Sequence, residues 1–264
     1  MTLARILICA GSDSGGGAGI QADIKTVTAL GGYAMTAITA LTAQNTLGVE
    51  AMMPVPADFI RSQMRAVLSD LGVDVVKTGM LGETAAIVAI AETLAELAPG
   101  IPLVVDPVMI AKGGTRLLAA DAIDALKAML IPRAALLTPN LPEAEALLGR
   151  AIADVAAMRA AALDLRRLGA QAVLIKGGHL PGNRLFDVLA GPNGIMVFEG
   201  ERIQTRHTHG TGCTLASAIA TLLGQGTALA ESVIRARVYL IEAIRTAPGL
   251  GQGQGPLNLA SGSK

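Results

Sequence analysis

Short, almost uninterrupted apolar runs alternate along the chain with longer segments in which apolar positions recur every three or four residues. Continuous apolar runs are typical of strands covered on both faces, and the longer period is typical of helices. The runs predict strands at residues 6–10, 34–41, 73–77, 103–106, 134–138 and 172–176. The periodic segments predict helices at residues 19–30, 57–70, 84–98, 121–130, 142–148 and 154–168. This alternation predicts a mostly parallel sheet with right-handed crossovers.

The last third of the chain has a different pattern. Two strands at 185–190 and 195–206, broken by "GPNG", predict a hairpin, and two helices are expected at 212–224 and 228–246. No linker or fixed-period repeat divides the chain, so we expect one domain over residues 1–264. The Gly- and Ser-rich tail is expected to be loose from about residue 250.

Composition excludes several classes of protein. Hydrophobic residues make up 52% and charged residues 16% of the 264 positions, which favours a large core over disorder. The 21 basic and 21 acidic side chains balance and form no basic stripe, which argues against nucleic acid or a membrane surface as a partner. No apolar run reaches transmembrane length. Only Cys9 and Cys213 are present, far apart, so we expect a cytoplasmic protein with reduced thiols.

Polar residues stand at the carboxyl end of nearly every predicted strand, where ligands bind in such sheets. They are Gly11–Asp13, Gln44 and Asn45, Lys77, Asp106, Asn140 and Lys176. Together they predict one shared rim of an active site.

The segment "AGSDSGGGAGIQAD" is a Gly-rich turn between a strand and a helix. It matches neither the dinucleotide fingerprint nor the P-loop, which argues against a dinucleotide oxidoreductase. It is either a flexible connection or a loop whose backbone approaches a ligand closely. Asp23 in the following helix either compensates the helix dipole or faces that ligand.

Two further polar positions leave their alternatives open. Gln44 can offer a donor and an acceptor to a flat heterocycle with adjacent N and NH₂ groups, or it is a turn residue. Asp106 precedes a proline and so stays extended, which suits a metal or phosphate contact or an ordinary Asp–Pro turn.

In "TPNLPEAEAL", Asn140 and Glu143 lie three residues apart at a helix start. They form either a capping box or a station for magnesium and phosphate. In "LIKGGH", Lys176 ends a strand and calls for an anionic partner, which a nucleotide phosphate would supply.

The segment "HTHGTGCT" leads into an Ala-rich helix. The turn at Gly210, Thr211 and Gly212 predicts an anion hole made of backbone N–H groups. Cys213 in the first turn is expected to have a lowered pKa, because the helix dipole favours the thiolate. The alternative is a buried, inert cysteine.

These segments, together with "TALTAQNT", "DVVKTGML" and "VVDPVM", resemble the hydroxymethylpyrimidine/phosphomethylpyrimidine kinases of thiamine biosynthesis over residues 5–258. That family belongs to the ribokinase-like superfamily. The resemblance implies a ribokinase-like three-layer α/β/α domain with a central, mostly parallel sheet. It also implies that ATP, with Mg²⁺, phosphorylates 4-amino-5-hydroxymethyl-2-methylpyrimidine to the monophosphate and then to the diphosphate. A homodimer that binds only small molecules is expected.

The same resemblance implies a role for each matching residue. The substrate pocket is expected to include Gln44, Gly11, Asp23 and Met80. Nucleotide contacts are expected from Lys176, Thr211 and Asp106, and a link to magnesium through water or phosphate from Asn140 and Glu143. Cys213, which follows the catalytic turn with Gly210 and Gly212, is expected to be the general base, where sugar and pyridoxal kinases commonly have Asp.

One departure from the family pattern, one expected flap and two rivals accompany this interpretation. Gln254 stands where the family often has His, and residues 111–118 are expected to form a mobile flap. One rival is a pyridoxine, pyridoxal or pyridoxamine kinase, because those substrates are also flat, hydroxymethylated heterocycles. The other is a regulatory protein that binds a pyrimidine or a nucleotide without turnover.

Overall fold

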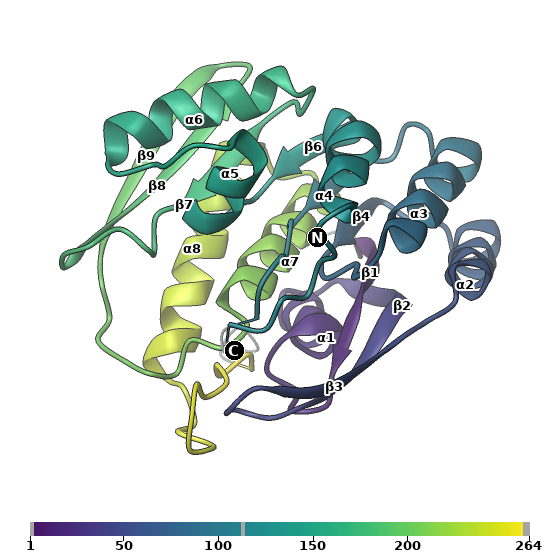
Figure 1. The fold of residues 1–264 in the computed structure, drawn as a ribbon, viewed down its shortest axis with the longest axis horizontal. Helices are drawn as coiled ribbons and strands as arrows, with labels where there is room; N and C mark the ends of the chain where they lie inside the picture. The colour runs from purple at the N-terminus through teal and green to yellow at the C-terminus, as the bar shows by residue number, and fades with distance from the viewer. Residues whose placement is uncertain (1–2, 112–113, 261–264) are drawn as a thin grey trace.

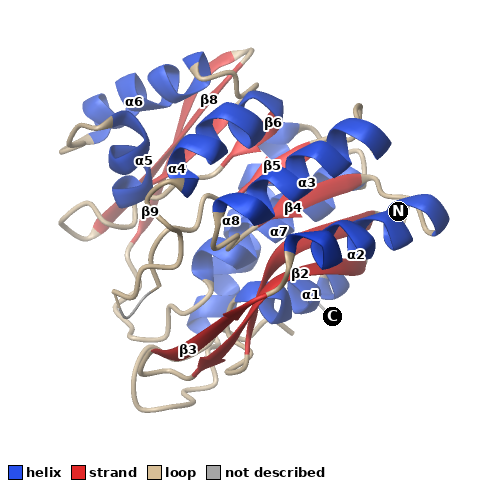
Figure 2. Cartoon of the chain, turned by 45° about the vertical axis from the view of Figure 1, so that its right-hand side comes forward, coloured by secondary structure: helices blue, strands red, loops and turns tan. Residues whose placement is uncertain are grey.

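The computed structural model describes residues 3–111 and 114–260, which form one sheet between two layers of helices (Figures 1 and 2). The strands are β1 (Arg5–Asp13), β2 (Tyr33–Gln44), β3 (Val49–Pro54), β4 (Val75–Thr78), β5 (Leu103–Val105), β6 (Ala134–Leu137), β7 (Val173–Lys176), β8 (Arg184–Gly191) and β9 (Gly194–Glu201). They lie in the order β3-β2-β1-β4-β5-β6-β7-β8-β9.

Neighbouring strands from β2 to β7 in this order pair in parallel, whereas β3, β8 and β9 pair antiparallel with their neighbours. The carboxyl ends of the parallel strands therefore lie at the same edge of the sheet. This topology confirms the predicted mostly parallel sheet and the predicted hairpin.

The helices cover both faces, as the three-layer prediction requires. One face carries α1 (Gly19–Ala29), α7 (Thr211–Gly224) and α8 (Leu229–Arg245). The other carries α2 (Ala57–Asp70), α3 (Thr84–Leu97), α4 (Ala122–Ala125), η1 (Leu126–Leu130), η2 (Ile131–Arg133), α5 (Leu141–Leu148) and α6 (Val155–Arg167). No helix in the described part of the chain is long and apolar enough to cross a membrane.

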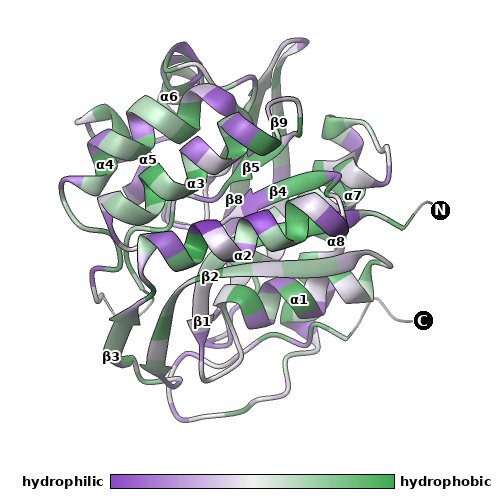
Figure 3. Cartoon of the chain, turned by 90° about the vertical axis from the view of Figure 1, so that its right-hand side faces the viewer, coloured by the Kyte–Doolittle hydropathy of each residue, from purple (hydrophilic) through white to green (hydrophobic). Residues whose placement is uncertain are grey.

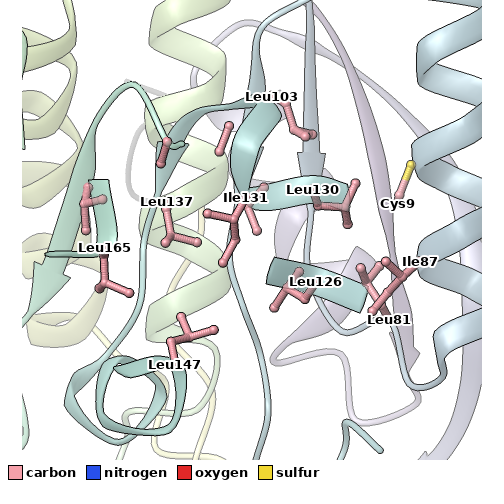
Figure 4. Close-up of a cluster of buried hydrophobic side chains, with 14 of the residues drawn as sticks. Cys9, Leu81, Ile87, Leu103, Leu126, Leu130, Ile131, Leu137, Leu147 and Leu165 are labelled. Atoms are coloured by element: carbon pink, nitrogen blue, oxygen red, sulfur yellow. The ribbon is translucent and has the colours of Figure 1, made fainter. Parts of the chain in front are cut away.

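Burial on both faces explains the continuous apolar runs. In β1, Ile6 and Ile8 face the core under α7, whereas Leu7 and Cys9 face the core on the opposite side. Successive side chains of a strand point to opposite faces, so a strand covered on both sides needs apolar residues throughout. Figure 4 shows part of the larger core, where η1 and η2 pack beside β5 and β6.

Surface helices bury only one stripe. Helix α2 buries Ile60 and Met64 and exposes most of its other side chains. Its hydrophilic and hydrophobic positions alternate in Figure 3. This is the amphipathic pattern from which the helix was predicted.

Two elements differ from prediction. The helix expected at 121–130 is a short α-helix followed by a π-helical turn, in which the Ile131 N–H donates to the Leu126 carbonyl. Pro132 follows and has no N–H to continue the helical ladder. Strand β3 was not predicted, because it is a short edge strand whose mostly exposed residues, VEAMMP, show neither a regular alternation of apolar and polar positions nor a run of β-branched residues.

The tail was expected to be loose, and the structure corrects this for the residues it describes. Leu257 and Leu259 are buried against α1 and α8. The Gln254 N–H donates to the Thr46 carbonyl over 2.8 Å, beyond the end of β2. The Gly and Ser content concealed two apolar anchors spaced two residues apart. Residues 261–264 lie outside the described part.

Candidate active site

Helix α7 begins in a glycine turn at the carboxyl edge of the sheet. Its N-cap, Gly210, has a φ of 84°, and a Cβ there would overlap the carbonyl oxygen of Gly17. Glycine is the residue that combines this conformation with so close a contact. The Thr211 N–H donates to the Thr208 carbonyl over 3.4 Å and the Thr214 N–H to the Gly210 carbonyl over 2.9 Å, which leaves the N–H groups of Gly212 and Cys213 at the helix start to bind an anion. The turn thus has the geometry expected of an anion hole.

Lys176 and Asp106 form an ion pair beside this turn. The Lys176 Nζ donates to Asp106 Oδ1 over 2.8 Å. A Cβ at Gly212 would come within 3.2 Å of Lys176 Nζ and 3.6 Å of Asp106 Oδ2. The absence of a side chain at position 212 therefore lets the helix start approach the pair. The three residues that the sequence assigned to the nucleotide, including Thr211, thus lie around one turn.

Asp106 has one satisfied and one unsatisfied oxygen. Its Oδ1 accepts from Lys176 and lies 3.2 Å from the Thr138 hydroxyl. Its Oδ2 is buried and has no hydrogen-bond partner among the described residues. A buried carboxylate oxygen without a partner is costly, so this atom calls for a cation or a donor from a ligand.

Asn140 and Glu143 form a capping box at the start of α5. The Glu143 N–H donates to Asn140 Oδ1 over 2.9 Å, and the Asn140 N–H donates to Glu143 Oε2 over 2.8 Å. The capping interpretation is therefore confirmed, while the magnesium role stays a prediction. Burial raises the pKa of Glu143 to about 7, although the nearby Lys176 lowers it.

Cys213 is half-buried in the first turn of α7. The pKa of its thiol is raised to about 12, mainly by burial, and the charges of Asp23 and Asp106 act in the same direction. Lys77 and a hydrogen bond with the Gly19 backbone act in the opposite direction but do not outweigh burial. The expected lowering of this pKa by the helix start is therefore wrong.

A buried ion pair lies next to the thiol. The Lys77 Nζ, at the end of β4, donates to both carboxylate oxygens of Asp23 over 2.9 Å, and both side chains are fully buried. The Ser217 hydroxyl donates to Asp23 Oδ1 over 2.7 Å. Burial lowers the pKa of Lys77, but Asp23 and Cys213 hold it above its ordinary value. Asp23 lies in the second turn of α1, so compensation of the dipole in the first turn does not explain it.

Gly11 and Met80 pack together at the ends of β1 and β4. The Gly11 N–H donates to the Met80 carbonyl over 3.1 Å, and a Cβ at Gly11 would overlap the Met80 methyl group. Met80 also packs against Ala40 and Leu117, which lies in the predicted flap. Positions 112 and 113 of that flap fall outside the described residues.

Gln44 ends β2 and lines a small hollow together with His209 and Gln254. Gln254 therefore lies near the substrate residue predicted at position 44, although the sequence alone gave it no role. Its side chain accepts from the Thr208 hydroxyl at 3.2 Å.

Sequence reasoning missed the pair formed by Asp13 and His209. Asp13 accepts N–H bonds from Gly15, Gly17 and Ala18, and His209 Nε2 lies 2.8 Å from Asp13 Oδ2. Burial acts to raise the pKa of Asp13, but these hydrogen bonds hold it below its ordinary value. The Asp before three glycines is a signal for a side chain that organises its own turn. Its partner, 196 residues away, has no such signal.

Several known proteins resemble this chain in sequence or in fold. The profile of the phosphomethylpyrimidine kinase family matches residues 13–258. The thiamine biosynthesis bifunctional protein ThiED of Geobacter sulfurreducens is 54% identical over 253 residues, and the match covers 96% of this chain but only 51% of that protein. The hydroxymethylpyrimidine/phosphomethylpyrimidine kinase of Rhizobium meliloti is 50% identical, with 96% of this chain and 95% of that one covered.

Among solved structures, an ADP complex of Bacillus subtilis pyridoxal kinase superposes with a TM-score of 0.90 at 37% sequence identity. The superposition covers 98% of each chain. This likeness confirms the ribokinase-like fold.

Proposed function

The chain belongs to the phosphomethylpyrimidine kinase family, and from this membership we propose how its residues carry out two phosphoryl transfers. ATP phosphorylates 4-amino-5-hydroxymethyl-2-methylpyrimidine, and a second transfer converts the monophosphate to the diphosphate for thiamine biosynthesis. The observation that carries the proposal is the start of α7. There, Cys213 follows an anion hole that lies against the Lys176–Asp106 pair.

The nucleotide lies on the Lys176 side of this helix start. The N–H groups of Gly212 and Cys213, together with the Lys176 ammonium, stabilise the charge on the transferring phosphoryl group. Thr211 contacts the same phosphates from the first helical position. A water-excluded position strengthens these interactions, because the local dielectric is low.

The substrate lies on the Gln44 side. Gln44 reads the aminopyrimidine edge with one donor and one acceptor, while Gly11 and Met80 form the surface under the ring. Asp23 acts on the substrate pocket from below its surface, because its carboxylate is fully buried and already paired with Lys77. This arrangement leaves the hydroxymethyl group facing Cys213.

Cys213 accepts the hydroxyl proton of the substrate. Because burial raises its pKa to about 12, the free protein holds it mainly as the thiol. The reactive thiolate is a minor form, and the Lys77 ammonium beside it favours that form. Phosphoryl transfer has a loose transition state, so a proton acceptor is needed late in the reaction and a small reactive population suffices.

Mg²⁺ belongs to the proposal because the residues fit it. Asp106 Oδ2, which has no partner among the described residues, would supply the hard oxygen ligand that Mg²⁺ prefers. Asn140 and Glu143 would contact the ion through water. The described residues hold no group of three or more His, Cys, Asp or Glu side chains that could bind a metal. This suits an ion held mainly by phosphate oxygens and water, which neutralises charge on the phosphates.

The proposed setting is the cytoplasm, and the proposed assembly is a homodimer whose ligands are small molecules. Two free cysteines in the described chain support a reducing compartment. The exposed apolar residues Met53 and Phe59, near the β3 edge, support a contact with a second copy. Light scattering after size-exclusion chromatography measures the assembly directly.

A pyridoxal kinase activity is the second candidate, favoured by the likeness to the Bacillus subtilis enzyme. Incubation with ATP, Mg²⁺ and each alcohol, followed by measurement of ADP and phosphorylated products, separates the candidates. We expect the hydroxymethylpyrimidine to be consumed faster, with a diphosphate as the final product. Faster turnover of pyridoxal or pyridoxine would overturn the choice of substrate. Binding of both ligands without turnover would favour the regulatory alternative.

A further inference from the structure

The Gln44 side chain contacts two polar neighbours, and the orientation of its amide matches the hydrogen-bonding needs of neither. Its Nε2 lies 3.3 Å from His209 Nε2, and its Oε1 lies 3.1 Å from the Thr42 hydroxyl oxygen. The terminal N and O of an amide exchange places by a half-turn about the last side-chain bond. Which atom faces which neighbour is therefore decided by where the protons are.

The hydroxyl proton of Thr42 is already used in another hydrogen bond. Its hydroxyl oxygen lies 2.9 Å from the Ser12 carbonyl oxygen, which can only accept a hydrogen bond. A hydroxyl has one proton, and the shorter contact, to the Ser12 carbonyl rather than the 3.1 Å contact to Gln44, takes it. Toward Gln44, the Thr42 oxygen can then only accept, and it needs an N–H from the amide.

The proton on His209 is committed as well. Its Nε2 lies 2.8 Å from Asp13 Oδ2. Three backbone N–H groups also donate to Asp13, and together with His209 they hold its pKa below the ordinary value against the effect of burial, so its carboxylate is ionised and can only accept. His209 Nε2 therefore carries a hydrogen, whether the ring is neutral or charged. Toward Gln44, this nitrogen can only donate, and it needs the amide oxygen.

Thr42 and His209 each require the Gln44 amide to make the same half-turn, and the two arguments are independent of each other. We infer that Gln44 is fixed with Oε1 beside His209 and Nε2 beside Thr42, and that His209, held by Asp13, is a positioning residue for substrate specificity. The Nε2 hydrogen of His209 is then shared between Asp13 and Gln44, as three-centre hydrogen bonds allow. Every proton in the cluster has one acceptor or more.

The fixed amide sets the order of donor and acceptor that a ligand meets. The free N–H of Gln44 lies on the Thr42 side, and the free lone pair of its oxygen lies on the His209 side. A ligand must offer an acceptor to the first and a donor to the second. Adjacent ring N and NH₂ groups do so. A 4-oxo pyrimidine, with a ring N–H next to a carbonyl, offers the reverse order, and the site rejects it.

The test compares the 4-amino and 4-oxo forms of the hydroxymethylpyrimidine by calorimetric binding and by KM. The inference rests on the proposed function, because it assumes that Gln44 meets the substrate. We expect the intact protein to prefer the amino form by roughly tenfold to hundredfold, the range for leaving buried polar groups unpaired. Intact protein that neither binds nor phosphorylates either form would overturn the proposed function itself.

Variants then test the positioning role. His209→Phe and Thr42→Val each free the amide to turn, and we expect the preference for the amino form to fall mainly through KM. Thr42→Ser keeps the hydroxyl and is expected to retain the preference. If the intact protein discriminates and both His209→Phe and Thr42→Val discriminate equally well, the inference is wrong.

A second measurement needs no variant. In intact protein with ¹⁵N-labelled glutamine, the Gln44 amide protons are expected to show nuclear Overhauser contacts to the Thr42 methyl group. Stronger contacts to the His209 ring protons would place Nε2 on the opposite side and overturn the inference.

Discussion

Lys77 holds its ammonium group 2.9 Å from both carboxylate oxygens of Asp23, out of contact with solvent and within electrostatic reach of Cys213. Two buried charges of opposite sign thus sit beside the one thiol at the helix start. Removing one of them leaves the other uncompensated.

Lys77→Met is therefore expected to lower the free energy of unfolding by about 3–5 kcal/mol, because Asp23 would stay buried without its partner. Urea titration followed by circular dichroism measures the change. Lys25→Met is the matched control, since Lys25 is exposed and its loss should cost well under about 1 kcal/mol. Equal effects of the two substitutions would show that the buried pair does not stabilise the fold.

Cys213→Ala is expected to reduce turnover by roughly 10²–10⁴-fold, the usual contribution of a general base. The KM for ATP should change little, because the backbone N–H groups of the helix start remain. Steady-state ADP release measures both parameters. Near-normal turnover in this variant would remove Cys213 from the role of proton acceptor.

Alkylation by iodoacetamide reports the state of the thiol, because only the thiolate reacts. With a pKa of about 12, the Cys213 rate should rise about tenfold for each unit of pH from neutral to alkaline conditions. Mass spectrometry locates the adduct, and Cys213→Ser subtracts any reaction at the fully buried Cys9. A rate that levels off near neutral pH would show that the helix start does lower this pKa.

Asp13 links acid stability to the Gly-rich turn. Its pKa lies below the ordinary 3.8 in the folded protein, so its contribution is fully present above that value. The contribution is lost as pH falls through the lower folded-state pKa. Asp13→Asn should therefore cost about 1–3 kcal/mol near neutral pH, and the difference from the parent protein should shrink in strong acid. Urea midpoints across this range test it, and a difference that does not vary with pH would contradict it.

Substitutions at Gly210 and Gly226 distinguish the cost of backbone strain from the cost of a close contact, because both residues have a φ of 84°. A Cβ at Gly226 would meet open space, whereas one at Gly210 would overlap the Gly17 carbonyl. Gly226→Ala should cost only the left-handed strain of about 1–2 kcal/mol. Gly210→Ala should cost more and also abolish activity, as thermal unfolding and turnover will measure. Equal losses of stability in the two variants would show that the loops carrying Gly17 and Gly210 can move apart to make room for the added methyl group.

The sequence predicted most of the fold because local patterns encode it. Continuous apolar runs identified the buried strands, and periodicity placed α2 at 57–70, the bounds it has in the structure. Strand β3 was not predicted, because an exposed edge strand does not need the continuous apolar run of a buried strand. The end of the helix expected at 121–130 escaped because the π-helical turn depends on how η1 packs against the sheet.

The positions of the candidate site residues were predictable where a strand end or a glycine turn marks them, as at Asp106 or Gly210, whereas their roles stay predictions. The pKa of Cys213 was not, because it depends on burial, which the local sequence does not report. Nor was the Asp13–His209 pair, since only the folded chain brings the two residues together. Sequence patterns find groups that act locally, whereas long-range pairs need the fold.

The anchored tail has a consequence for how the protein is made. The Gln254 N–H bonds to Thr46, the Gly255 carbonyl accepts from the His209 N–H, and Leu259 closes the apolar contact behind them. The loops that carry Gln44 and His209 are therefore braced by residues that are synthesised after every strand of the sheet. A nascent chain can assemble its sheet before it can hold these two loops in place, so a variant that lacks residues 253–260 should fold yet remain inert.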